Sequence, residues 1–415
     1  MPNDLAKWLA NTSLSRLAIR QLTISAKPAT DYTIGDWNPA AFPPPKALIS
    51  AVTKHLKLNE VQYADVAGEA ALRLEVAKHW QRLTGCTFSL DQIMVASGAR
   101  PLLMLATKTL ITPHDVALYF VPNWNAANYL KDLVAKDSLI RVVTQPKNYF
   151  LPSLEQLKPY EHCVNLLWFN LPLNPSNAIY TKEQWRSFLN WWRAVNAQRL
   201  KNKLKPLFVV LDAIYHQLAD TTMWREFSEF RDLLDYAIII DGAAKSYAAT
   251  GMRLGWALGP SYLIERMVTL NSYLGSWPGT AEQRGMADFL TLEASFKSVN
   301  TLKAKLKSRA LALTKALNTL KQANYPVDFI PYKGGIYFNC QLNFKGYHYN
   351  SAAINHAEDL ANFLLKAAKI KIVSFKYLDA PEHEWWFRLA LSMVTKQEHA
   401  SAVSALSSAI KLLTK

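Results

Sequence analysis

Short apolar runs alternate with longer stretches of helical pattern through the middle of the chain, and this alternation constrains the fold more than any other feature. The apolar runs are Gln92–Ala96, Val116–Val121, Val164–Leu171, Leu207–Leu211 and Tyr236–Ile240. Continuous apolar runs of this kind are typical of parallel strands whose two faces are both covered by helices. We therefore predict an α/β domain with a parallel sheet in the middle of the chain.

The remaining parts of the chain indicate further structure around this domain. A length of 415 residues exceeds what one hydrophobic core usually supports. After about residue 290 a long helix rich in Lys, Leu and Ala is followed by strand-like segments around Gly334–Phe338 and a last helix. We predict an N-terminal arm with part of the small domain over residues 1–45, a large domain over 46–295, and a smaller α+β domain over 296–415.

Composition and charge limit the class of protein. Half of the residues are hydrophobic and 19% are charged, which excludes a disordered chain. The net charge of +15 suits an anionic partner, but the basic residues are scattered and no nucleic-acid-binding motif accompanies them. We expect no nucleic acid, no metal and no membrane as partners, since no apolar run is long enough for a span and no signal-peptide core is present. Isolated cysteines (Cys86, Cys163 and Cys340) favour reduced thiols and a cytoplasmic protein.

One lysine lies in a segment with specific chemistry. A buried strand over residues 238–241 ends in a turn of small residues, with Lys245 at its tip and Arg253 soon after. A lysine in that setting loses hydration and is held partly neutral, as an imine-forming amine requires, and an arginine nearby can clamp an anion. Taken alone, such a lysine is more often an exposed surface residue. No other lysine occurs between Lys205 and Lys297 to take the role.

Residues 241–256 resemble the lysine segment of class I/II aminotransferases of the aspartate aminotransferase type, which are fold-type I enzymes that use pyridoxal 5'-phosphate (PLP). Other motifs of that family follow in the same order between about residues 33 and 392. They are Gly35, Tyr63, Ser97-Gly98-Ala99, Trp124, Asn174-Pro175-Ser176-Asn177, Asp212-Ala213-Ile214-Tyr215 and Arg388. The resemblance implies a large domain with a mostly parallel seven-stranded sheet between helices, and a smaller α+β domain.

The resemblance also implies a role for each motif. Lys245 forms the Schiff base with PLP and moves the proton, with Tyr215 as the second catalytic residue. The cofactor-binding set is Ser97, Gly98, Ala99, Trp124, Asn174, Asp212, Tyr215, Lys245, Arg253 and, from a neighbouring subunit, Tyr63. The substrate-binding set is Gly35, Trp37, Asn174, Arg388 and Arg100. The ordinary alternatives are a helix cap for Asp212, a core position for Trp124 and a structural ion pair for Arg388.

Three positions differ from the family pattern or are ambiguous. Asn177 replaces a glycine, although Asn tolerates the left-handed backbone best among other residues. Gly242 stands where many relatives carry a phosphate-binding serine, for which Ser246 or Ser276 is the alternative donor. Arg100 stands where one subgroup places a lysine for the distal carboxylate of dicarboxylic substrates. It is equally compatible with a solvent-facing arginine at a helix start, and the abundant aromatic residues would also suit a larger or cationic side chain.

The leading functional hypothesis is an aminotransferase that moves an amino group between an L-amino acid and a 2-oxo acid. The resemblance implies a homodimer with shared active sites, to which Tyr63 and residues 272–280 contribute across the interface. The first alternative is a PLP enzyme of this fold with a diverted outcome: elimination, cyclisation, decarboxylation or oxidation of an amino acid. A less favoured alternative is a PLP-binding regulatory protein, because no DNA-binding motif precedes residue 33.

Overall fold

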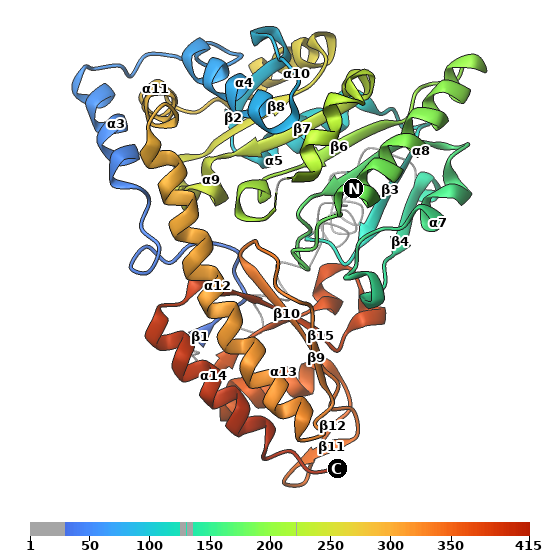
Figure 1. Ribbon diagram of the computed structural model, residues 1–415, viewed down its shortest axis with the longest axis vertical. Helices are drawn as coiled ribbons and strands as arrows, with labels where there is room; N and C mark the ends of the chain where they lie inside the picture. The colour runs from blue at the N-terminus through green and yellow to red at the C-terminus, as the bar shows by residue number, and fades with distance from the viewer. Residues whose placement is uncertain (1–29, 125–129, 131–135, 221) are drawn as a thin grey trace, which may run out of the picture.

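A seven-stranded sheet forms the centre of the large part of the molecule (Figure 1). The computed structural model describes residues 30–124, 130, 136–220 and 222–415, so the predicted arm before Thr30 lies outside the described residues. The strand order is β2-β8-β7-β6-β5-β3-β4, in which β8 pairs antiparallel with both neighbours and the other pairs are parallel. The strands are β2 (Ile93–Ser97), β3 (Val116–Val121), β4 (Leu139–Val143), β5 (Val164–Asn170), β6 (Phe208–Asp212), β7 (Ala237–Gly242) and β8 (Leu254–Leu258). The prediction of a mostly parallel, seven-stranded sheet is confirmed.

Helices cover both faces of this sheet, which explains why its strands are apolar throughout. On β7, Ile238 and Ile240 belong to the hydrophobic cluster that includes α5 and α10, whereas Ile239 belongs to the cluster on the opposite face with Trp80 and Trp185. Successive side chains of a strand point to opposite faces, so a strand between two helical layers needs apolar residues at every position. The helices of this part are α3 (Lys46–Lys57), α4 (Ala70–Thr84), α5 (Ala99–Leu110), α7 (Leu154–Leu157), α8 (Lys182–Lys201), α9 (Ala243–Ser246), α10 (Ser261–Leu274) and α11 (Thr280–Leu290).

A smaller antiparallel sheet forms the other part of the molecule. Its order is β14-β15-β10-β9, and the N-terminal strand β1 pairs with β13 beside it. The elements are β1 (Thr30–Asp31), α12 (Glu293–Gln322), β9 (Val327–Phe329), β10 (Tyr337–Leu342), β11 (Tyr347–Tyr349), β12 (Ala352–Ile354), α13 (Ala357–Ala367), β13 (Ile370–Lys371), β14 (Val373–Ser374), β15 (Trp386–Ala390) and α14 (Lys396–Ile410). In Figure 1 the long helix α12 runs from α11 beside the large sheet down to the smaller sheet. The numbered domain boundaries remain predictions.

The apolar runs predicted five strands of the large sheet but not β4 and β8. Strand β4 lies at the edge of the sheet, and its Arg141 forms an ion pair with Glu382 at 2.8 Å. An edge strand is half solvated and does not need a continuous apolar run. Strand β8 follows the lysine segment directly and pairs antiparallel between β2 and β7, an arrangement that apolar periodicity does not specify.

The sheet brings the predicted motifs to one edge. Strands β2, β5, β6 and β7 run in the same direction and end at Ser97, Asn170, Asp212 and Gly242. The loops that follow these carboxyl ends therefore meet at one side of the sheet, which is where open α/β sheets bind ligands.

Gly242 allows β7 and β8 to approach closely at this edge. A Cβ atom at position 242 would lie 2.5 Å from the Leu254 carbonyl oxygen and 2.9 Å from the Gly255 Cα.

We predict that Gly242→Ala lowers the free energy of unfolding by about 1–3 kcal/mol, because backbone atoms have to move to admit the methyl group. Urea unfolding measures the change. Gly251→Ala is the control, since nothing lies within 4 Å of its added Cβ; equal stabilities of the two variants would contradict the prediction.

Candidate active site

One cavity of about 510 Å³ lies between the carboxyl edge of the large sheet and the smaller sheet. This size suits a small organic ligand. The lining residues are Thr33, Ile34, Gly35, Asp36, Ala99, Arg100, Trp124, Asn174, Asp212, Ile214, Tyr215, Ala244, Lys245, Thr250, Arg253, Tyr337, Leu378 and Arg388. Most of the predicted site residues are therefore brought together, from segments more than three hundred positions apart in the sequence.

Lys245 projects into this cavity from α9, the short helix that follows β7. Its Nζ donates a hydrogen bond to the carbonyl oxygen of Gly35. Burial lowers the pKa of Lys245 to about 8, and the charges of Arg100, Arg388 and Arg253 act in the same direction, against the attraction of Asp36. The amine is thus partly neutral near pH 8, as a nucleophilic amine requires.

Asp212 is a buried carboxyl group at the end of β6, and no cationic side chain among the described residues forms an ion pair with it. Burial, together with the charge of Asp241, raises its pKa to about 7, against the hydrogen bonds that it accepts. Its hydrogen-bond partners are the Trp124 side chain, Asn170 and the backbone of Ile214, none of which is charged. An uncompensated carboxylate in a cavity favours a ligand that brings a positive charge or a proton, such as a pyridinium nitrogen.

A second region of the cavity suits an anion. Helix α5 begins at Ala99 after Gly98, whose φ of 93° is left-handed. Arg253 lies against this turn, with Nη2 donating to the Ser97 carbonyl at 3.2 Å and Nη1 to the Thr250 carbonyl at 2.8 Å. A helix start and a guanidinium together form a typical phosphate-binding arrangement.

The backbone bonds correct the predicted set of amides at this helix start. The Ser97 amide donates to the Ser276 carbonyl at 3.0 Å and the Gly98 amide to the Ala96 carbonyl at 2.6 Å. Both donors are therefore already engaged within the protein. The first two helical amides, of Ala99 and Arg100, have no intrahelical acceptor because of their position, and Pro101 has no amide hydrogen.

A third region combines an arginine with two polar side chains and a backbone carbonyl. Arg388, on β15, donates from Nη1 to Asn174 Oδ1 at 3.0 Å and from Nη2 to the Thr33 carbonyl at 2.8 Å. Its Nε is buried without a hydrogen-bond partner in the described part of the chain. The guanidinium lies 4.4 Å from the centre of the Tyr337 ring, a cation–π contact. A buried arginine with an unused donor favours an anionic ligand such as a carboxylate.

Tyr337 is one site residue that sequence reasoning missed; Thr33, Asp36 and Thr250 also line the cavity without having been predicted. Its hydroxyl lies 3.1 Å from the Tyr215 hydroxyl and 3.2 Å from Asn174 Nδ2. Tyr337 lies two residues after the Gly334-Gly335 pair, in a segment that the sequence predicted only as strand-like. Asn177 has the left-handed φ of 57° expected at that position, and its side-chain amide donates to the Tyr337 carbonyl.

Several predicted residues lie outside the cavity. Trp37 is buried against Phe42, and its indole nitrogen donates to the Ala244 carbonyl at 3.1 Å, so the structure gives it a packing role in place of the predicted substrate contact. Tyr63 is 89% exposed. Neither alternative phosphate donor lines the cavity: the Ser246 hydroxyl is buried, and Ser276 contributes its carbonyl to the Ser97 amide.

A cluster of side chains of the types that bind metals lies on the face of the large sheet that packs against Trp80. His79 Nε2 and His216 Nε2 are 3.0 Å apart, and Asp241 lies 3.4 Å from His216 Nδ1. The His216 Nδ1 also bonds to the Ala213 carbonyl at 2.9 Å, so both of its nitrogens already have partners. This arrangement is a hydrogen-bonded chain of side chains, and we assign no metal to it.

Comparisons with known proteins agree with this geometry. Residues 36–406 match the family model described as aminotransferase class I and II. The chain belongs to the class I and II aminotransferase family. Among its relatives, an aspartate aminotransferase of Thermotoga maritima is 26% identical over 257 residues, which are 61% of this chain and 65% of that protein. An aspartate/prephenate aminotransferase of Thermus thermophilus is 26% identical over 67% of this chain and 70% of that protein.

The fold of this aminotransferase-family chain is also similar to solved structures. The aspartate aminotransferase of Rhizobium meliloti superposes with a TM-score of 0.81 at 21% identity, covering 96% of both chains. The aligned stretch of sequence spans slightly less than two thirds of the Thermotoga relative.

No helix in the described ranges is both long and apolar enough to cross a membrane.

The depressed pKa of Lys245 generates a pH prediction. In the cofactor-free protein, the rate at which added PLP is captured by Lys245 should rise about tenfold per pH unit up to about pH 8 and then level off, because only the neutral amine reacts. Absorbance of the bound cofactor follows the rate. Asp36→Asn should shift the profile to lower pH, since Asp36 attracts the protonated form, and Lys245→Ala should remove it. A midpoint near 10.5 would contradict the prediction.

The same shift predicts a stability profile with a definite sign. The folded pKa of about 8 lies below the ordinary value of 10.5, so the unfolded chain binds more protons between these two pH values. The free energy of unfolding should therefore gain a favourable contribution from Lys245 as pH rises from about 8 to 10.5. Urea unfolding of cofactor-free Lys245→Leu should lack this contribution.

Proposed function

We propose that this protein is an aminotransferase that uses PLP to move an amino group between an L-amino acid and a 2-oxo acid. The observation that carries the proposal is that one cavity holds both a buried amine of lowered pKa, Lys245, and a buried carboxyl group of raised pKa, Asp212. In the part of the chain that the structure describes, no ion pair compensates Asp212. The donor set fits the cofactor: Arg253 with the start of α5 for its phosphate, and Asp212 for its ring nitrogen.

Each residue has a defined task in this proposal. PLP, when bound, supplies a ring that withdraws electrons from the substrate α-carbon. Lys245 would hold the cofactor through its amine, and the neutral amine would accept the substrate α-proton and return one to the reacting carbon. Asp212 would keep a proton at the ring nitrogen. Tyr215 and Asn174 would donate hydrogen bonds to the phenolic oxygen of the ring.

Trp124 and Arg388 would orient the reactants. The Trp124 indole bonds to Asp212 and borders the cavity, so its face would pack on the ring that Asp212 holds. Arg388 would hold the substrate α-carboxylate, with Gly35 beside it. The Tyr337 ring and Asn174 fix the guanidinium plane for that contact.

The spectrum of the loaded protein tests the proposal. Adding an L-amino acid should convert the yellow cofactor to its amine form, because the amino group is transferred to it. Adding a 2-oxo acid should restore the yellow colour, because the second half-reaction removes that amino group. Lys245→Ala should show neither change. Release of ammonia, carbon dioxide or peroxide without recovery on adding an oxo acid would favour one of the diverted PLP reactions instead.

We propose further that acidic amino acids are among the donors. Arg100 lines the cavity, and its guanidinium lies 5.4 Å from the centre of the Trp124 ring. A second cation in addition to Arg388 would bind the distal carboxylate of aspartate or glutamate. The names of the Thermotoga and Thermus relatives, both aspartate-using aminotransferases, support the same substrate class.

A donor panel tests this assignment. Arg100→Ala should lower kcat/KM for aspartate and glutamate by about tenfold or more, since a charged hydrogen bond contributes roughly 1.5–3 kcal/mol, and it should leave alanine nearly unchanged. Arg100→Lys is the control that keeps the charge. If the parent protein does not accept aspartate or glutamate as donors but does accept aromatic or basic amino acids, the assignment is contradicted.

We propose a cytoplasmic homodimer. The three cysteines are all free, which supports a reducing compartment. Large apolar side chains are exposed on the loop after α3 and at the end of α10, among them Val61, Tyr63, Tyr273 and Leu274. Such side chains favour contact with a second copy of the chain.

A further inference from the structure

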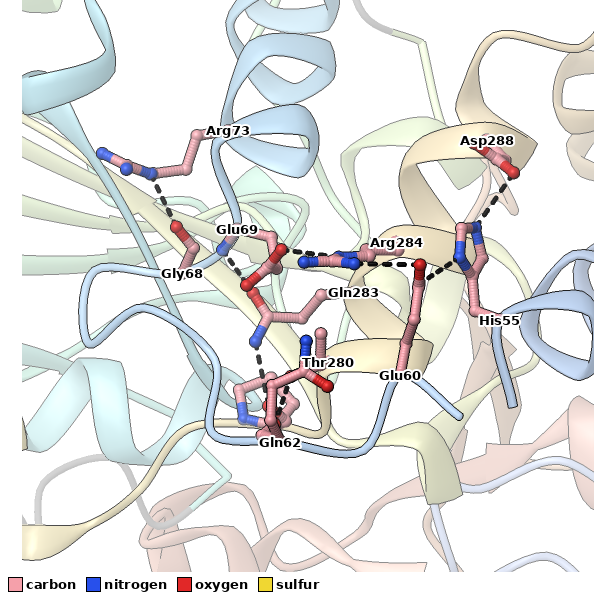
Figure 2. Close-up of polar contacts among 11 residues, drawn as sticks. His55, Glu60, Gln62, Gly68, Glu69, Arg73, Thr280, Gln283, Arg284 and Asp288 are labelled. Atoms are coloured by element: carbon pink, nitrogen blue, oxygen red, sulfur yellow. Dashed lines mark hydrogen bonds and ion pairs between the residues drawn. The ribbon is translucent and has the colours of Figure 1, made fainter. Parts of the chain in front are cut away.

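A connected set of polar side chains holds the loop that carries Tyr63 (Figure 2). We call residues 58–69, between α3 and α4, the Tyr63 loop. The loop has no helix or strand of its own, and the Tyr63 side chain contacts Trp277 edge-on, with ring centres 6.3 Å apart. Because Tyr63 is almost fully exposed, its own side chain contributes little to fixing the loop.

Arg284, on α11, joins the two ends of the Tyr63 loop. Its Nη1 lies 3.0 Å from Glu60 Oε1, and its Nε donates to Glu69 Oε2 at 2.8 Å. Figure 2 shows the guanidinium between the two carboxylates. A planar guanidinium fixes two acceptors in direction as well as distance, which a lysine cannot do.

Neighbouring contacts attach the same loop to α3 and α11. The Gln283 side chain accepts from the Glu69 amide at 2.8 Å, and the Thr280 hydroxyl donates to the Gln62 carbonyl at 2.6 Å. His55 lies between Glu60, at 2.6 Å, and Asp288, at 3.0 Å. The loop is thus held at Glu60, Gln62 and Glu69.

The two helices that supply these contacts pack closely on each other. A Cβ added at Gly285 of α11 would lie 2.6 Å from the Val52 Cα of α3. The frame that holds the loop is therefore a tight helix pair. Side chains fixed from such a frame are placed more accurately than side chains on a free loop.

We infer that Arg284 is a positioning residue that acts in trans: it fixes the Tyr63 loop so that Tyr63 completes the cofactor site of the neighbouring subunit. This inference rests on the proposed homodimer and cofactor. The subunit in which the loss of PLP affinity appears distinguishes a positioning role in trans from a merely structural role. Loss of Arg284 in one subunit should weaken the site of the other subunit and leave its own site intact.

The first measurement is the affinity for PLP. Arg284→Gln should weaken PLP binding about tenfold, the loss expected for one hydrogen bond to a charged phosphate. Tyr63→Phe should weaken it by a similar factor, and the two changes together should not add. Arg186→Gln is the matched control. Arg186, on α8, also bridges two glutamates, with Glu226 at 2.5 Å and Glu229 at 2.6 Å. It should leave PLP affinity unchanged.

Hybrid dimers decide between action in trans and in cis. In a hybrid of Lys245→Ala and Arg284→Gln subunits, the single site with a lysine receives Tyr63 from a subunit with intact Arg284. Borohydride trapping of PLP on that lysine should show parental affinity. In the reverse hybrid, one subunit carries both changes and the other is parental, so the lysine-bearing site should show the tenfold loss.

Each other outcome has a definite meaning. If the loss follows the subunit that carries Arg284→Gln, the positioning role in trans is wrong while the proposed function stands. If light scattering finds a monomeric parent, both the dimer and this inference fail, and a parent that binds no PLP refutes the proposed function itself. If Arg284→Gln does not fold, Glu60→Gln and Glu69→Gln test the same bridge by its other partners, and parental affinity in both would overturn the inference.

Discussion

Positive charge gathered around one cavity is the constraint on which the rest of the site depends. Lys245, Arg100, Arg253 and Arg388 line the same space. The three arginines and burial together lower the pKa of the lysine, so the neutral amine is a product of its surroundings. Four cationic side chains around one cavity attract anionic groups, which is why a phosphate and a carboxylate are the ligands that the geometry favours.

The sheet places these charges, and at one position its strands leave no room for a side chain. Asp212 and Lys245 follow neighbouring parallel strands, so their loops open at the same edge. At Gly242 the backbones of β7 and β8 leave no room for a side chain. A serine at this position would not fit without a backbone shift, so the phosphate contacts that we propose are assigned to Arg253 and the start of α5.

Particular residues show where sequence reasoning succeeded and failed. Continuous apolar runs located the inner strands, because burial on both faces leaves a signal in every position. Asn177 was expected to adopt a left-handed backbone and does. Trp37 and Tyr337 were misjudged in opposite directions: the first is a packing residue and the second lines the cavity. Each lies within two residues of a recognised motif, but which way a side chain points depends on the packing of both sheets.

The sequence by itself determined the fold class, the family and the order of the chemical groups along the chain, since these depend on residue type and local spacing. Only the tertiary structure decided which groups share a cavity, what burial does to the pKa of Lys245 and Asp212, and that the Ser97 and Gly98 amides are already bonded. It also revealed the bridge from Arg284 to Glu60 and Glu69. The physical reason is that desolvation and hydrogen bonding depend on neighbours distant in sequence, and folding alone sets those neighbours.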